Sequence, residues 1–177
     1  MKIIRLISLS PSLDIDIHPD SAMILPGRPF FMPEWGEAWM AVMHPAVRIG
    51  RLGKNIARKF AGRYYDGVTM AFRVTLAETS GLDGVLSGMD STLMHGEWLP
   101  AESASGELSV EVNGDAFSAG PFADKIDEVI AKVSEYMTLK MGDVILLPAV
   151  GQPVNLKEGL RIDVSVDLTP VMELRTV

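Results

Sequence analysis

The chain has 177 residues, no cysteine and a net charge of −7. These features exclude a disulfide framework and a thiolate metal site, and they argue against nucleic acid as a partner, because an extended phosphate-binding surface would have to overcome the protein's own negative field. With 47% apolar and 22% charged residues, the composition is globular rather than disordered. A chain of this length is expected to form a single domain spanning residues 1–177.

The N-terminal region is predicted to hold one strand and then a long loop. Residues 2–9 are apolar but few, and Arg5 interrupts them, so we expect a strand rather than a signal peptide. No later stretch is apolar enough for a membrane span, no membrane partner is expected, and the cytoplasm is the expected location. Residues 10–33 are expected to form a loop with short extended pieces, because prolines disfavour a helix there: Pro11, Pro19, Pro26, Pro29 and Pro33.

A cluster of aromatic and methionine side chains follows, and it favours a core or a dimer interface over a cofactor site: Trp35, Trp39, Met40 and Met43. Residues 41–51 have a partly strand-like pattern, which Pro45 is expected to confine to a sheet edge or a bulge. Residues 55–64 are predicted to form a helix, since Ile56, Phe60 and Tyr64 fall four apart. The basic residues of that helix are interpreted as a solvated face rather than an anion site.

Residues 68–76 alternate cleanly between two faces and predict a strand. Arg73 is the only charge on its face, where its neighbours are threonine and alanine. A long cation among small residues suits the floor of a pocket, but a solvent-facing strand is the favoured interpretation. Residues 81–100 are predicted to be loop-rich, and their acidic and histidine residues match no established metal-ligand spacing: Asp83, Asp90, His95 and Glu97.

The remainder predicts a hairpin, a helix and several strands. Residues 108–112 lead into Asn113-Gly114, a strong two-residue turn signal. A helix is expected to begin at Asp124 as N-cap and to end at Gly142. Further strands are predicted at 144–147, 160–168 and 171–177. Strands outnumber helices, so the predicted fold class is α+β, dominated by sheet, with two main helices.

Three blocks of the chain resemble the fumarylacetoacetate hydrolase family, whose members act on acylpyruvates and related oxo acids. The first includes Ile17-His-Pro-Asp-Ser-Ala-Met-Ile-Leu25, the second spans residues 48–69, and the third spans residues 126–143 and ends in Met-Gly-Asp. The resemblance covers nearly the whole chain. It implies a mixed β roll and a homodimer.

The resemblance also implies a divalent cation, usually magnesium or manganese, held by a Glu-x-Glu pair and a later Asp. The Glu pair falls on Val42 and His44, and the Asp falls on Arg73, so all three carboxylates are absent. The family's Lys falls on Ser87, although the Asp three residues later remains as Asp90. A cation such as magnesium requires hard oxygen ligands, and a fixed positive charge opposes it.

Other family motifs are also replaced. The Ala-Arg-Asp-x-Gln run that follows the metal Asp becomes Leu76-Ala-Glu-Thr-Ser80 in this chain. The family's Thr-Gly-Thr-Pro loop becomes the segment 147–153, Leu-Pro-Ala-Val-Gly-Gln-Pro. The sequence therefore predicts a scaffold that kept its fold and lost its metal chemistry.

Two functional hypotheses follow. In the first, the chain is not an enzyme, has no metal or other cofactor, and binds a small anion or a partner protein, with the Arg73 guanidinium clamping a carboxylate in place of the cation. In the second, it is a hydrolase, isomerase or decarboxylase of a small oxo acid with a relocated or metal-independent site. The candidate acid–base groups for that site are His44, Glu78, Asp90 and His95. A homodimer is expected, and pairing with an active relative is an alternative.

Overall fold

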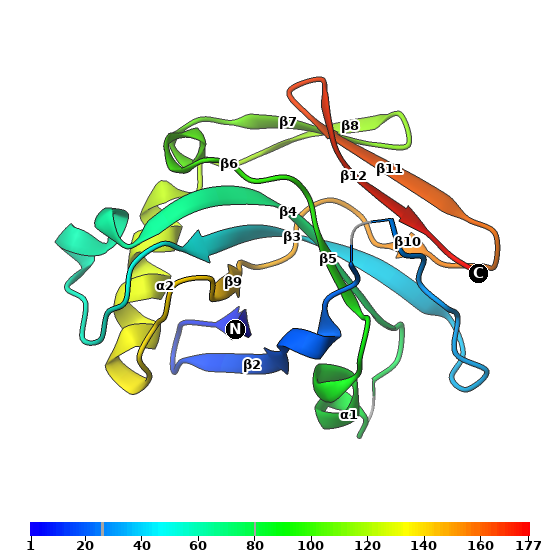
Figure 1. The fold of residues 1–177 in the computed structure, drawn as a ribbon, viewed down its shortest axis with the longest axis horizontal. Helices are drawn as coiled ribbons and strands as arrows, with labels where there is room; N and C mark the ends of the chain where they lie inside the picture. Colours follow the sequence, from blue (N-terminus) through cyan, green and yellow to red (C-terminus); the bar gives the residue numbers. More distant parts are fainter. Residues whose placement is uncertain (26, 80) are drawn as a thin grey trace.

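The computed structural model describes residues 1–25, 27–79 and 81–177, and these residues form two β-sheets, two α-helices and three short 3₁₀ turns (Figure 1). The larger sheet contains β1 (Lys2–Ser8), β2 (Asp14–Pro19), β3 (Trp39–Ile49), β4 (Tyr65–Leu76), β5 (Leu93–His95), β6 (Leu99–Pro100), β9 (Val144–Leu146) and β10 (Val154–Asn155). The smaller sheet contains β7 (Leu108–Val112), β8 (Asp115–Ala119), β11 (Arg161–Val166) and β12 (Thr169–Arg175). The helical elements are α1 (Asp83–Gly88), α2 (Ala123–Tyr136), η1 (Asp20–Ala22), η2 (Arg58–Arg63) and η3 (Ala101–Ser105).

The larger sheet is mixed and curls upon itself. Its strand order is β2-β1-β9-β3-β4-β5, with β1 and β9 parallel and the other pairs antiparallel. The chain leaves edge strand β2 and within a few residues joins β5 at the opposite edge, where the Ile24 N–H donates to the Leu93 carbonyl at 2.6 Å. A six-strand path whose two edges are joined by so short a segment must be strongly curved. The curvature gives this sheet an inner and an outer face.

The outer face carries most of the hydrophobic core. Near the start of β3, Trp39, Ala41 and Met43 pack under the smaller sheet. Towards its end, Val47 and Ile49 pack against the apolar stripe of α2. Figure 1 shows β3 and β4 crossing the whole molecule, with the smaller sheet above them and α1 below. The two long strands therefore tie both halves of the core together.

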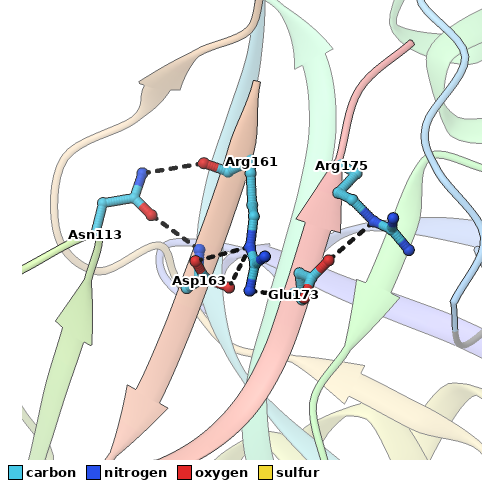
Figure 2. A network of polar contacts seen from close by, with 5 residues as sticks. All are labelled: Asn113, Arg161, Asp163, Glu173 and Arg175. Carbon is cyan, nitrogen blue, oxygen red and sulfur yellow. Dashed lines mark hydrogen bonds and ion pairs between the residues drawn. The ribbon is translucent and has the colours of Figure 1, made fainter. Parts of the chain in front are cut away.

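The strands of the smaller sheet alternate between buried apolar residues and exposed polar ones, as in β11. The exposed side carries ion pairs (Figure 2). Arg161 lies 3.0 Å from Asp163 and 3.1 Å from Glu173, which also pairs with Arg175 at 2.9 Å. The Asn113 side-chain oxygen accepts from the Asp163 N–H at 2.8 Å. Exposed pairs of this kind contribute little individually, so the buried side determines the register.

Most of the predicted strands are confirmed, as is the sheet-dominated α+β class. The Asn113-Gly114 turn joins β7 to β8 with φ of +52° and +91°, the left-handed values that such a two-residue turn requires. The long helix forms as well, although it begins at Ala123 and ends at Tyr136, earlier than Gly142. Asp124 lies inside its first turn, and no side chain caps it.

The predicted helix over residues 55–64 is wrong. Asn55 has a φ of +52°, its N–H donates to the Ser134 carbonyl, and the Ile56 N–H donates to the Ser134 hydroxyl. The backbone of this segment thus pairs with the end of α2 instead of with itself, and only the 3₁₀ turn η2 remains. Tertiary hydrogen bonds override a weak helical pattern here.

Two further expectations are corrected. The region 10–33 contains β2, six residues paired with β1, rather than only a loop. β3 lies between β9 and β4 in the middle of the sheet, so Pro45 does not confine it to an edge. Pro45 is tolerated because β9 is short and ends opposite it, where the Leu147 N–H still donates to the Pro45 carbonyl.

Trp39 and Met43 belong to the core, as one of the two interpretations of that cluster predicted, whereas Trp35 is exposed. Pro26 and Ser80, assigned from the sequence to the N-terminal loop and to the replaced family motif, lie outside the described residues. Within the described ranges, no helix is long and apolar enough to cross a membrane.

Candidate functional site: a polar cluster on the inner face of the curled sheet

The inner face of the larger sheet gathers small residues and a few polar groups. The strand register pairs Val42 directly with Arg73 and His44 with Ala71, so His44 and Arg73 are diagonal neighbours on one face. The opposite wall of the curl contributes Arg5, Asp16 and His18, close enough for their charges to act on one another and on Arg73. The apolar part of this face is a buried cluster that includes Ala46 and Ala71.

Arg73 is not on a solvent-facing strand, which corrects the interpretation favoured from the sequence. The residues that flank it on the same face, Ala71 and Thr75, are 2% and 3% exposed, and Arg73 itself is half-buried. The pKa of Arg73 is lowered to about 10, chiefly by burial and also by nearby Arg5, while Asp16 and Asp83 oppose the shift. The guanidinium is therefore still charged at neutral pH. The pocket-floor alternative is the one that the burial supports.

Arg73 has no direct ion-pair partner within the described part of the chain, although the carboxylates of Asp16 and Asp83 act on it and raise its pKa. Its Nε is buried without a hydrogen-bond partner, and the guanidinium makes no ion pair with any described residue. Arg5, by contrast, is neutralised, because its Nε donates to the Asp16 carboxylate at 2.9 Å and a second guanidinium nitrogen also contacts that carboxylate. Among the described residues, the inner face therefore carries one guanidinium, that of Arg73, that no carboxylate contacts directly.

His44 is buried and held in one orientation by its neighbour in sequence. Pro45 has no N–H, so it cannot donate to Leu147 across the sheet, although the Leu147 N–H donates to the Pro45 carbonyl. The Leu147 carbonyl instead accepts a hydrogen bond from His44, whose ring Nδ1 lies 2.7 Å from the carbonyl oxygen. A carbonyl only accepts hydrogen bonds, so Nδ1 carries the proton. The pKa of His44 is lowered to about 4, chiefly by burial and also by Arg73 and Arg5, against the opposing hydrogen bond to Leu147.

His18 is the second buried histidine, only 1% exposed. Neither ring nitrogen has a hydrogen-bond partner among the described residues; the Ser87 backbone lies near the ring but outside hydrogen-bonding geometry. Burial lowers the pKa of His18 to about 4, while Asp16 opposes the shift and Arg73 reinforces it. Both imidazoles are neutral at pH 7 and both hold unpartnered nitrogens.

The four acid–base candidates named from the sequence are not brought together. His44 and His95 lie on one face, but Ala71 separates them across the sheet, which places their backbones roughly 10 Å apart. Glu78 and Asp90 are exposed in segments that follow β4 and α1. Within residues 1–25, 27–79 and 81–177, no three acidic or histidine side chains cluster closely enough to hold a metal ion.

A separate cavity of about 610 Å³ lies between β5 and β12. Its lining is mainly apolar and includes Met23, Trp98 and Met172. It meets the inner face at His95, whose ring packs on Trp98 with centroids 4.7 Å apart. The lining of this cavity does not include Arg73, His44 or His18.

Sequence reasoning missed Arg5, Asp16 and His18 as members of the cluster. Residues 14–18 alternate polar and apolar side chains, which is the pattern of a half-buried strand. The surrounding prolines led to the prediction of a loop instead. The proximity of these residues to Arg73 depends on the curvature of the sheet, which no local pattern encodes.

The inner face does not fit the divalent cation that the family resemblance implies. Val42 supplies no ligand, and Arg73 places a positive charge at the position of the family's Asp. Asp16 is the nearest carboxylate, but it is paired with Arg5. His44 Nε2 alone is a poor ligand for a hard cation such as magnesium.

The fold defines the class of the protein first. The structure is similar to 5-carboxymethyl-2-hydroxymuconate delta-isomerase from Mycobacterium smegmatis, with a TM-score of 0.83 and 22% identity, covering 99% of this chain and 78% of the other. It is also similar to maleylpyruvate hydrolase from Sphingobium, with a TM-score of 0.80 and 21% identity over 99% of this chain and 70% of the other. At such identities the likeness concerns the fold.

The sequence then gives the family. Residues 11–176 match the family described as fumarylacetoacetate (FAA) hydrolase C-terminal, and the chain belongs to this family. It is 25% identical over 163 residues to a 4-hydroxyphenylacetate degradation bifunctional isomerase/decarboxylase of Salmonella dublin, covering 89% of this chain but 38% of that protein. An uncharacterized protein of Pyrococcus abyssi is 28% identical over 176 residues, 90% of this chain and 77% of that protein.

Proposed function

We propose that this chain is a fumarylacetoacetate hydrolase family scaffold that has lost the family's divalent-cation site and binds a small carboxylate at Arg73. The observation that carries the proposal is a guanidinium on the inner face with no ion-pair partner among the described residues, at the position where the family resemblance puts a metal-binding Asp. The family cation would present positive charge to an anionic ligand. Arg73 presents positive charge from the protein itself.

The charge balance of the inner face supports a single anion. Arg5 and Asp16 neutralise one another, and both histidines are neutral at pH 7. Asp83 acts on Arg73 without forming an ion pair with it, so the Arg73 guanidinium keeps its hydrogen-bond donors for an anion. A largely buried charge without a partner is costly, and a carboxylate that accepts two parallel guanidinium hydrogen bonds offsets that cost. The two residues that flank Arg73 on this face, Ala71 and Thr75, have small side chains.

The relatives suggest the first ligands to test. One similar structure is named a maleylpyruvate hydrolase and another a putative fumarylpyruvate hydrolase, from Burkholderia cenocepacia. Pyruvate-type acids are therefore the starting panel. This choice comes from the names of those proteins and is independent of the charge argument.

Isothermal titration calorimetry with pyruvate, oxaloacetate and an acylpyruvate tests the proposal. Charge-assisted hydrogen bonds contribute about 1.5–3 kcal/mol, so Arg73→Ala is expected to weaken binding by at least tenfold. Arg161→Ala is the matched control, because Arg161 is exposed on the smaller sheet, away from the inner face (Figure 2). Binding that is equal in the wild type and Arg73→Ala, or absent for every small carboxylate tried, would refute the proposal.

A second candidate function is a metal-independent hydrolase, isomerase or decarboxylase of a small oxo acid. The observation that favours it is the neutral His44 ring, whose bare Nε2 could act as a base beside Arg73. The relatives are named as isomerases, a decarboxylase and hydrolases. Turnover of an acylpyruvate in EDTA that disappears in His44→Ala would favour this candidate. Turnover unaffected by alanine at His44, Glu78, Asp90 and His95 in turn would exclude it.

The homodimer remains a prediction. The exposed Trp35 and the apolar cavity between β5 and β12 offer surface for an interface. Light scattering coupled to gel filtration measures the mass directly, and a single species of 19.2 kDa would contradict the prediction.

A further inference from the structure

We infer that the inner-face site, if it binds a carboxylate at Arg73 as proposed above, selects a 2-hydroxy carboxylate over the corresponding 2-oxo carboxylate, and that His44 is the residue that selects it. The inference deepens the proposed function by naming the ligand class. It rests on which His44 nitrogen carries the proton.

The backbone around Pro45 fixes that proton. The Leu147 carbonyl would ordinarily accept a hydrogen bond from the residue opposite it in β3, but that residue is Pro45 and has no N–H. His44 Nδ1 lies 2.7 Å from the Leu147 carbonyl oxygen in place of the missing N–H, so it must be the donor. In a neutral imidazole the other nitrogen is then an acceptor without a proton. His44 Nε2 is therefore a buried acceptor with no described partner.

The site thus offers a cationic donor and a neutral acceptor on one sheet face. Arg73 donates to a carboxylate, and His44, its diagonal neighbour, requires a hydrogen from the ligand. The hydroxyl of a 2-hydroxy acid is attached to the carbon next to its carboxylate and can donate to Nε2. The oxo oxygen of a 2-oxo acid has no hydrogen, so this oxygen and His44 Nε2 would be two acceptors with no hydrogen to share. A buried acceptor left unsatisfied by the wrong ligand costs binding energy.

The charges around His44 keep this arrangement in place. The groups that act on its ring across the inner face are Arg73, Arg5 and His18. The two arginines oppose a second proton on the ring, and His18 offers it no negative charge. The Nδ1–H form with a bare Nε2 is thus the form that a ligand meets at neutral pH.

The test compares lactate, as both enantiomers, with pyruvate and propionate by calorimetry at pH 7.5. The better lactate enantiomer is expected to bind at least about tenfold more tightly than pyruvate. His44→Asn is the informative variant, since an asparagine NH2 group can keep the donor to Leu147, while the shorter side chain places no acceptor at the position of His44 Nε2. It is expected to bind lactate and pyruvate within about twofold of each other. His95→Asn, which changes a histidine outside the proposed site, is expected to retain the preference.

The outcomes separate the two proposals. Lactate and pyruvate bound equally by the wild type, and both lost in Arg73→Ala, would overturn the selection by His44 and leave the carboxylate site standing. No binding of any of these acids would overturn both. Nitrogen-15 spectra of the histidine rings give an independent reading, and a proton found on His44 Nε2 would overturn the inference whatever the affinities.

Discussion

The two buried histidines are expected to make the protein lose stability as the pH falls from 6.5 towards 4. Each has a pKa of about 4 in the folded protein, against 6.5 for an ordinary histidine in the unfolded chain. Between these values the unfolded state binds more protons, so the free energy of unfolding decreases as the pH is lowered. One pKa unit corresponds to about 1.4 kcal/mol, so each histidine costs roughly 3 kcal/mol once the pH is below 4.

Urea unfolding at several pH values between 7 and 4.5 measures this effect. The two histidines together are expected to contribute a slope of about 2.7 kcal/mol per pH unit near pH 5, and His44→Asn is expected to remove about half of it. Val133→Ala is the control, because Val133 is a buried residue of α2 away from the inner face, and the substitution lowers stability without changing the slope. Carboxylates that titrate in this range cancel in the difference between wild type and variant. An identical slope in His44→Asn would refute the reasoning.

Three further results are expected. Asp143→Ala removes a carboxylate, 1% exposed, that accepts from Lys2 and from the Lys140 N–H, and thermal unfolding should show a loss of about 3 kcal/mol; an unchanged midpoint would contradict this. Gly53→Ala would place a Cβ 2.5 Å from Tyr64 Cε1, so a loss of about 1–3 kcal/mol is expected, and a neutral result would show that the ring gives way. With carboxylates restored at the three family metal positions, Mn²⁺ should raise the melting temperature, and at a hundredfold excess over Kd the free energy of unfolding should increase by about 2.7 kcal/mol. The melting temperature of the wild type should not change with Mn²⁺. The variant that tests this carries Val42→Glu, His44→Glu and Arg73→Asp.

Much of the fold could be predicted from local pattern. Strand alternation located β4, β7, β11 and β12, and the apolar stripe located α2, because in these elements one face is buried and the other is not. The segment after Asn55 could not be predicted in this way. Its hydrogen bonds go to Ser134, far along the sequence, and a helical spacing of three apolar residues does not outweigh them.

The candidate site could be predicted only in part. The family resemblance puts Val42, His44 and Arg73 at the positions of metal-binding carboxylates, but the sequence leaves open whether Arg73 faces solvent or a pocket. Burial of the inner face decides this, and burial follows from the curvature that joins β2 to β5. The role of Pro45 could not be predicted from the sequence either. As a strand breaker it suggested an edge, whereas in the middle of the sheet it frees the Leu147 carbonyl for His44.

The most direct test of the central claim is a crystal structure of the protein soaked in Mn²⁺ together with lactate, with diffraction recorded at a wavelength where manganese scatters anomalously. We expect a carboxylate within hydrogen-bonding distance of the Arg73 guanidinium and no anomalous peak beside His44. A manganese peak between His44 and Arg73 would contradict the claim, because it would mean that the inner face still holds the family's cation.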